Sequence, residues 1–154
     1  MFKSTDRGNN WTQINNGLDS LETNILTVDP NDSEILYLGT DDDGVYKSKD
    51  GGESWNKLTV SSLSKSFGVG DIIVDPQNSN NVYIGTVDYF RLSESRGVLG
   101  DFGVYKSTDG GATWEEFNVG LNHLGVFSLE LSEENRILYA GTRAGGVYWI
   151  SLDN

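Results

Sequence analysis

The sequence predicts an all-β fold built from repeated four-stranded sheets. One observation is composition: 19 Gly, seven Tyr, six Phe and four Trp stand against two Pro and one Met in 154 residues. Such a chain is typical of short strands joined by tight turns. A second observation is that no segment keeps a helical apolar period over eleven residues. The third is an internal repeat, which defines the organisation of the whole chain.

The repeated element is the motif S-x-D-x-G-x-x-W, which occurs three times. Its fixed residues are Ser4, Asp6, Gly8 and Trp11, then Ser48, Asp50, Gly52 and Trp55, then Ser107, Asp109, Gly111 and Trp114. An Asp carboxylate can accept N–H groups across a turn, a Gly can adopt positive φ, and a Trp can pack the turn against a sheet. We therefore expect these residues to be structural rather than catalytic.

Each repeat holds four apolar runs between turn residues, and we expect each run to be a strand. The predicted strands are 24–29, 35–40, 45–48 and 55–58 in one repeat and 71–75, 82–86, 104–107 and 114–117 in the next. First strands such as 72–74 are continuously apolar, so both of their faces are covered, whereas the fourth strands carry charges. A four-stranded unit of about 45 residues with this gradient is typical of a β-propeller blade.

The motif resembles the Asp box of the bacterial neuraminidase repeat propellers, and the resemblance covers the whole chain. That family includes sialidases, xyloglucan-degrading endoglucanases, sortilin-type receptors and a photosystem assembly factor. The resemblance implies that each box lies between the third and fourth strands of a blade, on the rim opposite the ligand face. It specifies the fold more closely than the function.

The predicted units are a partial blade with a box at 1–14, blades at 15–58 and 59–117, and a partial blade at 118–154. The thirteen expected strands amount to about three blades, and closed propellers have four to eight. We expect two chains to close a six-bladed ring as a homodimer; the alternative is that the chain is a piece of a longer propeller. For the dimer, we expect the last strand, 146–152, to pair with 11–14 of the second copy, with some fraying at one end.

Candidate ligand residues lie in the loops of the expected ligand face, above all in the insertion 87–102. They are Asp88, Tyr89, Arg91, Glu94, Arg96, Asp101 and Arg143. Arginine clusters bind carboxylates through paired donors, and three arginines serve this purpose in sialidases. The segment 90–92 resembles the Phe-Arg-Ile-Pro element of sialidases, but it lacks the Pro and follows two boxes.

These patterns favour a non-catalytic binding or assembly module that recognises a glycan or a protein. The alternative is part of a glycoside hydrolase, sialidase-like or xyloglucanase-like, whose catalytic residues lie on other blades or on a partner chain. The resemblance to the Asp-box family implies an extracytoplasmic location.

Charge and composition exclude other classes of function. Eleven Lys and Arg against 23 Asp and Glu give a net charge of −12, which disfavours nucleic acid and membrane partners. The chain has no Cys and one His, so thiolate and histidine-cluster metal sites are not expected. The run Asp41, Asp42 and Asp43 offers oxygen ligands for Ca²⁺, although calcium loops usually alternate their carboxylates with other residues. We otherwise expect no cofactor.

Overall fold

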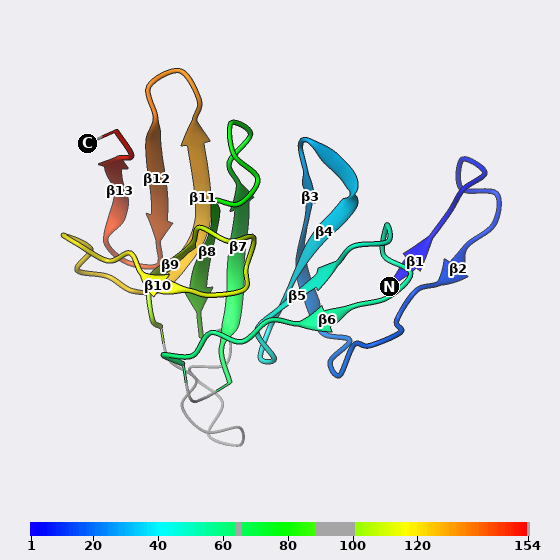
Figure 1. The fold of residues 1–154 in the computed structure, drawn as a ribbon. Coiled ribbons are helices and arrows are strands. Elements are labelled where there is room, and N and C mark those ends of the chain that lie inside the picture. Colours follow the sequence, from blue (N-terminus) through cyan, green and yellow to red (C-terminus); the bar gives the residue numbers. More distant parts are fainter. Residues whose placement is uncertain (64–65, 89–100, 154) are drawn as a thin grey trace.

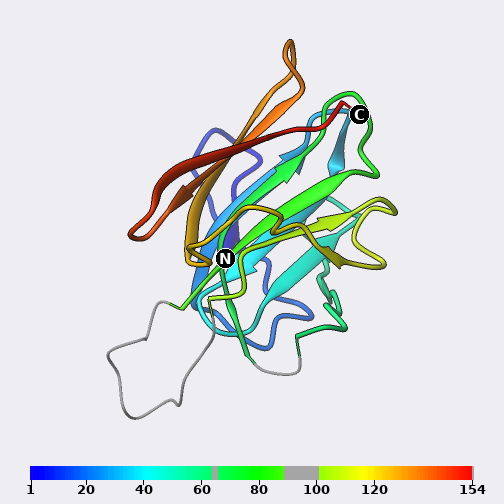
Figure 2. The ribbon, with the colours of Figure 1, turned by 90° about the vertical axis from the view of Figure 1, so that its left-hand side faces the viewer.

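The computed structural model describes residues 1–63, 66–88 and 101–153, and within them every regular element is a β-strand. The strands are β1 Phe2–Lys3, β2 Thr12–Gln13, β3 Thr23–Asp29, β4 Asp32–Thr40, β5 Val45–Ser48, β6 Asn56–Lys57, β7 Gly68–Val74, β8 Val82–Val87, β9 Val104–Ser107, β10 Glu115–Glu116, β11 Val126–Ser132, β12 Ile137–Thr142 and β13 Gly146–Ser151. They form four antiparallel sheets in a row (Figure 1): β1-β2, β3-β4-β5-β6, β7-β8-β9-β10 and β11-β12-β13. Viewed along the row, the sheets overlap one another (Figure 2).

The expected all-β fold of four-stranded repeats is confirmed. We call the sheets β3–β6, β7–β10 and β11–β13 the first, second and third blades, and β1–β2 the N-terminal hairpin. The third strands β5 and β9 have the expected bounds, whereas β6 and β10 are two residues long. We expected β6 and β10 to begin at the box Trp. The ring of that residue packs inward from the turn, so the pairing of the strand with its neighbour starts one residue later.

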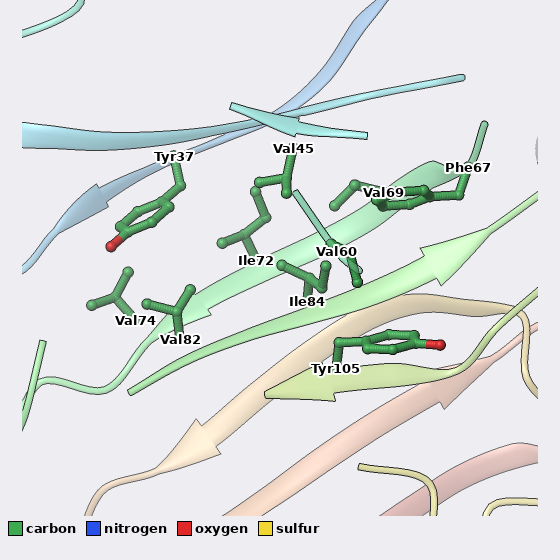
Figure 3. Packing of buried hydrophobic residues seen from close by; sticks show 10 residues of the cluster. All are labelled: Tyr37, Val45, Val60, Phe67, Val69, Ile72, Val74, Val82, Ile84 and Tyr105. Atoms are coloured by element: carbon green, nitrogen blue, oxygen red, sulfur yellow. The ribbon is translucent and has the colours of Figure 1, made fainter. Parts of the chain in front are cut away.

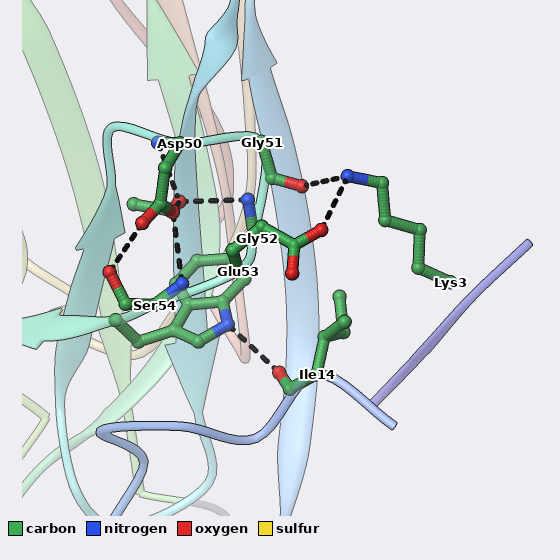
Figure 4. Close-up of polar contacts among 9 residues, drawn as sticks. Lys3, Ile14, Asp50, Gly51, Gly52, Glu53 and Ser54 are labelled. Carbon is green, nitrogen blue, oxygen red and sulfur yellow. Dashed lines mark hydrogen bonds and ion pairs between the residues drawn. The ribbon is translucent and has the colours of Figure 1, made fainter. Parts of the chain in front are cut away.

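Each box is a closed hydrogen-bonded turn, and Figure 4 shows that of the first blade. The Ser48 hydroxyl donates to Asp50 Oδ1 at 2.7 Å and accepts the Gly52 N–H at 2.8 Å. Asp50 accepts the backbone N–H of Ser54 at 2.9 Å and its hydroxyl at 2.5 Å. These bonds hold the carboxylate in its charged form and lower the pKa of Asp50 to about 2.

The other two boxes repeat this pattern. Asp109 accepts the N–H and hydroxyl of Thr113 at 2.8 and 2.6 Å, and its pKa is likewise lowered to about 2. Asp6 accepts the N–H and side-chain amide of Asn10 at 2.8 and 2.6 Å. The box glycine Gly52 has φ of 91°, a left-handed conformation that favours glycine. In all three boxes the Asp side chain therefore closes the turn by accepting hydrogen bonds from within it.

The core lies between blades rather than within one sheet. One face of β4 and β5 packs on the next blade, and Figure 3 shows Tyr37 and Val45 directed at Ile72 and Val74. A Cβ added to Gly39 on β4 would lie 2.7 Å from Val69, so the two sheets approach more closely than a side chain allows. The same packing joins the second blade to the third, with Tyr83 and Val104 against Leu129 and Leu131.

Polar contacts to the boxes hold neighbouring sheets together. Lys47 on β5 donates to the Gly110 carbonyl in the second blade's box at 2.7 Å, and the Tyr37 hydroxyl donates to the same carbonyl at 3.1 Å. Lys3 of the N-terminal hairpin makes the equivalent bond to Gly51 at 2.9 Å. Each of these boxes is therefore bound by the sheet that precedes it.

A buried ion pair joins the second and third blades beside the boxes. Arg136 donates to both oxygens of Asp75, at 3.0 and 2.6 Å, and the Asp75 side chain is fully buried. Burial alone would raise the pKa of Asp75, but the Arg136 guanidinium and the Gln77 N–H outweigh it, so the pKa is lowered.

The box carboxylates predict acid sensitivity. Because the pKa of Asp109 falls from its ordinary 3.8 to about 2 on folding, the unfolded chain binds protons more readily in this range. The stability contributed by Asp109 is therefore present above pH 3.8 and is lost as pH falls toward 2. We expect Asp109→Asn to lower the free energy of unfolding at neutral pH and to flatten its fall below pH 3.8, as measured by urea unfolding. Glu134→Gln, at an exposed residue of the β11–β12 turn, is the control; equal acid dependence in wild type and Asp109→Asn would contradict the assignment.

Candidate functional site

The candidate site is the loop face, which we define as the side of the blades formed by the second-to-third-strand loops and the inter-blade connections. The described parts of the loops are 41–44, 88, 101–103 and 143–145, and those of the connections are 14–22, 58–63, 66–67 and 117–125. The boxes lie at the other end of the strands (Figure 1), as the family resemblance implies.

A threonine fixes the start of each loop, and in the first two blades this threonine is buried. Thr86 donates its hydroxyl to the Gly103 carbonyl and accepts the Phe102 N–H, both at 2.9 Å. Thr40 bonds in the same way to the Gly44 carbonyl and the Asp43 N–H, also at 2.9 Å. Sequence reasoning missed this role, although a Gly-Thr pair lies at the end of the second strand in the first and third blades, and one residue before it in the second, and gave the signal.

Three of the predicted ligand residues meet where the second and third blades adjoin. Asp101 accepts the backbone N–H of Asp88 at 2.8 Å and lies 3.9 Å from the Arg143 guanidinium. Arg143 also donates to the Asp88 carbonyl and lies over the Phe127 ring, 5.2 Å from its centroid. We call Asp88, Asp101, Arg143 and Phe127 the loop-face cluster.

The loop-face cluster combines buried and accessible groups. Asp88 is 2% exposed, whereas Arg143 keeps 29% of its side chain exposed and Phe127 is 42% exposed. A guanidinium can donate to ligand oxygens, and an exposed ring offers an apolar surface beside it. The sequence did not indicate Phe127, which lies at the β-bulge of β11, a feature visible only once the strands are paired. The other four predicted ligand residues, Tyr89, Arg91, Glu94 and Arg96, lie outside the described residues.

Other groups of the first blade bind a carboxylate of its acidic turn. Asp43 accepts hydrogen bonds from the Tyr46 hydroxyl and from Lys57. Among the described residues, no three acidic or histidine side chains are grouped as metal ligands. The calcium site therefore stays a prediction.

Asp41 differs from its neighbours in the turn. Burial and the adjacent carboxylates of Glu22 and Asp42 raise its pKa. Beside the turn, a hollow is lined by polar Asp43, Lys57, Thr59 and Ser66 and by apolar Leu58, Val60, Leu63 and Phe67. The first blade thus presents a carboxyl group of raised pKa on the loop face.

Comparison with known proteins identifies the family. The family model Sortilin-Vps10, described as "Sortilin, neurotensin receptor 3", matches residues 1–149. This chain belongs to the Sortilin-Vps10 family. The match confirms the Asp-box propeller resemblance of the sequence.

Curated relatives of this Sortilin-Vps10 chain include enzymes. It is 31% identical over 136 residues to a xyloglucanase of Paenibacillus sp, with 74% of this chain and 13% of the relative covered. It is 31% identical over 140 residues to xyloglucanase Xgh74A of Acetivibrio thermocellus, with 83% of this chain and 16% of the relative covered. The chain thus spans about a seventh of the length of these relatives.

Solved structures confirm the propeller fold. An ancestral GH74 enzyme superimposes with a TM-score of 0.74 at 22% identity, covering 96% of this chain and 19% of that one. The GH74 enzyme of Niastella koreensis gives a TM-score of 0.66 at 26% identity, covering 98% of this chain and 24% of that one. No helix in the described part of the chain is long and apolar enough to cross a membrane.

The threonine hydrogen bonds predict that removing the hydroxyl lowers the free energy of unfolding by different amounts in different blades. Thr86→Val keeps the side-chain shape but leaves the Phe102 N–H without its acceptor, so we expect unfolding to become easier by about 1–3 kcal/mol. Thr142→Val is the matched control, because Thr142 is more exposed and water can replace its bond to the Gly145 N–H. Urea unfolding of both variants checks this; equal losses would mean that burial does not set the cost.

Proposed function

We propose that this chain is a propeller segment of a xyloglucan-acting glycoside hydrolase and that its loop face binds the glucan chain. The observation that carries the proposal is the placement of Arg143, which is held by Asp88 and Asp101 of the second blade's β8–β9 loop and lies over Phe127. A guanidinium fixed in this way loses little side-chain entropy on binding, which favours recognition of sugar hydroxyls. The similarity to xyloglucanases supports the choice of polysaccharide.

The catalytic part of the proposal rests on Asp41. Burial and the neighbouring carboxylates raise the pKa of Asp41, which is the direction that favours the protonated form needed by a general acid. Glycoside hydrolysis also needs a second carboxylate about 5 to 9.5 Å away across a cleft. We propose that parts of the enzyme outside this chain supply it, since the chain covers 13% to 16% of the curated xyloglucanases compared.

A binding module without catalysis is the second candidate. It is favoured by the engagement of Asp43 with Lys57 and of Asp101 with Arg143, because these carboxylates are already bound by cations within the chain. A polysaccharide ligand, in either case, favours the extracytoplasmic location expected from the sequence.

Titration with a xyloglucan oligosaccharide tests the proposal. We expect Arg143→Ala to weaken binding by about 1.5–3 kcal/mol, the contribution of a charged hydrogen bond, while the melting temperature stays close to wild type. Arg7→Gly is the matched control: it removes an exposed guanidinium from a box and places Gly at a positive φ of 59°. Absence of binding by the wild-type chain, or equal binding by Arg143→Ala, would refute the proposed site.

A reducing-end assay on the same samples separates the two candidates. We expect the chain by itself to bind the oligosaccharide without releasing new reducing ends, because the second carboxylate is not supplied. Release that is lost in Asp41→Asn would mean that the chain holds a complete catalytic pair.

A further inference from the structure

The guanidinium of Arg143 keeps N–H groups that no other member of the loop-face cluster uses. One nitrogen, Nη2, donates to the Asp88 carbonyl, and the same nitrogen lies 3.9 Å from Asp101 Oδ1. The other two, Nη1 and Nε, have no acceptor in the described part of the chain. Because 29% of the Arg143 side chain is exposed, these N–H groups are the donors available to a ligand.

Asp101 places a negative charge beside that guanidinium. Its carboxylate comes from the β8–β9 loop of the second blade, and 18% of its side chain is exposed. At 3.9 Å the two charges attract each other, but the separation is longer than a hydrogen bond. Asp101 therefore offsets the charge of Arg143 without occupying its N–H groups.

A glycine of the third blade makes room for this carboxylate. A Cβ added to Gly125 would lie 2.9 Å from Asp101 Oδ2 and 3.1 Å from Oδ1, so the carboxylate occupies the space of a side chain at position 125. The Gly125 carbonyl also accepts the backbone N–H of Arg143 at 2.8 Å. The same glycine thus fixes the main chain of Arg143 and admits Asp101 next to it.

The first blade has a different arrangement of charge at the matching positions. Asp41 donates its N–H to the Glu22 carbonyl at 2.9 Å, which is the bond that Arg143 makes in the third blade. Burial raises the pKa of Asp41, and the negative charge of Glu22 raises it further. Like charges thus adjoin in the first blade and opposite charges in the third. The pairing of Arg143 with Asp101 is therefore specific to one junction and is not a feature of the repeat.

We propose that Asp101 determines the specificity of the loop face by excluding ligands that carry carboxylates; this inference rests on the proposed function and deepens it. Sugar hydroxyls are neutral, so they can accept hydrogen bonds from Arg143 Nη1 and Nε without repulsion from the nearby carboxylate. A uronic acid bound to the same donors would bring its carboxylate next to Asp101, and adjacent like charges oppose binding. The net charge of −12 acts in the same direction over longer distances. The site therefore selects a neutral glucan over an acidic one.

Asp101→Asn tests the role of the charge, because an amide keeps the shape of the side chain and its oxygen still accepts the Asp88 N–H. The probes are a xyloglucan oligosaccharide and an oligomer of galacturonic acid of similar length, titrated in the same low-salt buffer. We expect the wild type to bind the galacturonate oligomer about tenfold more weakly than xyloglucan. In Asp101→Asn the dissociation constant for galacturonate should fall about tenfold, whereas that for xyloglucan should change by less than about threefold.

Further measurements assign the gain to the charge beside Arg143. Adding Arg143→Ala to Asp101→Asn should abolish the gain, and high salt should reduce it, since charges exposed to solvent are screened. Glu134→Gln is the matched control: it removes the same charge from an exposed residue of the β11–β12 turn, at the box end of the strands, and should leave galacturonate binding unchanged. Melting curves of all variants verify that each is folded.

The outcomes for this inference and for the proposed function are distinguishable. If the wild type does not bind xyloglucan, the proposed function is refuted, and the effect of Asp101→Asn on galacturonate binding still decides the role of Asp101. Wild-type binding of galacturonate as tight as that of xyloglucan would overturn the inference without any variant. So would an Asp101→Asn chain that binds galacturonate no better than the Glu134→Gln chain does.

Discussion

The constraint on which this structure depends is that no sheet can cover its own apolar faces. Tyr37 and Val45 of the first blade are buried only because the second blade lies against them. Gly39 allows this approach, since the Val69 side chain occupies the space that a Cβ would need. A blade of this Sortilin-Vps10 chain therefore buries its apolar residues only against a neighbouring blade. The boxes, the lysines of the third strands and the Arg136–Asp75 pair all form contacts between neighbouring sheets.

The site follows from the same constraint. Arg143 belongs to the third blade, whereas Asp88 and Asp101 belong to the loop of the second. Their contact exists because the packing of β8 against β11 places the two loops side by side, as the shared core cluster of Tyr83, Val104 and Val126 shows. A ligand bound there would contact groups from two blades, so recognition depends on the junction more than on either loop alone.

The sequence predicted the fold well because its information is local and repeated. Ser48, Asp50 and Gly52 all act within one turn, and the third strands 45–48 and 104–107 are bounded by clear turn residues. The fourth strands were predicted too long, because the ring of Trp55 packs inward and pairing begins after it. The site was harder to predict: the role of Phe127 depends on a bulge and on Arg143 from another strand, and neither leaves a periodic signal.

The position of the second blade has a consequence for motion. The four-stranded first blade lies on one side of it and the three-stranded third blade on the other. The residues Ile72, Val82 and Ile84 at its centre are at most 1% exposed. Stability in stacked repeats is roughly the sum of each unit and its interfaces, so a unit with two interfaces opens least often. The amide hydrogens of β7 and β8 should therefore exchange with solvent more slowly than those of the outer sheets, and the loop-face cluster, which spans the second and third blades, is fixed on one side to the most rigid part of the chain.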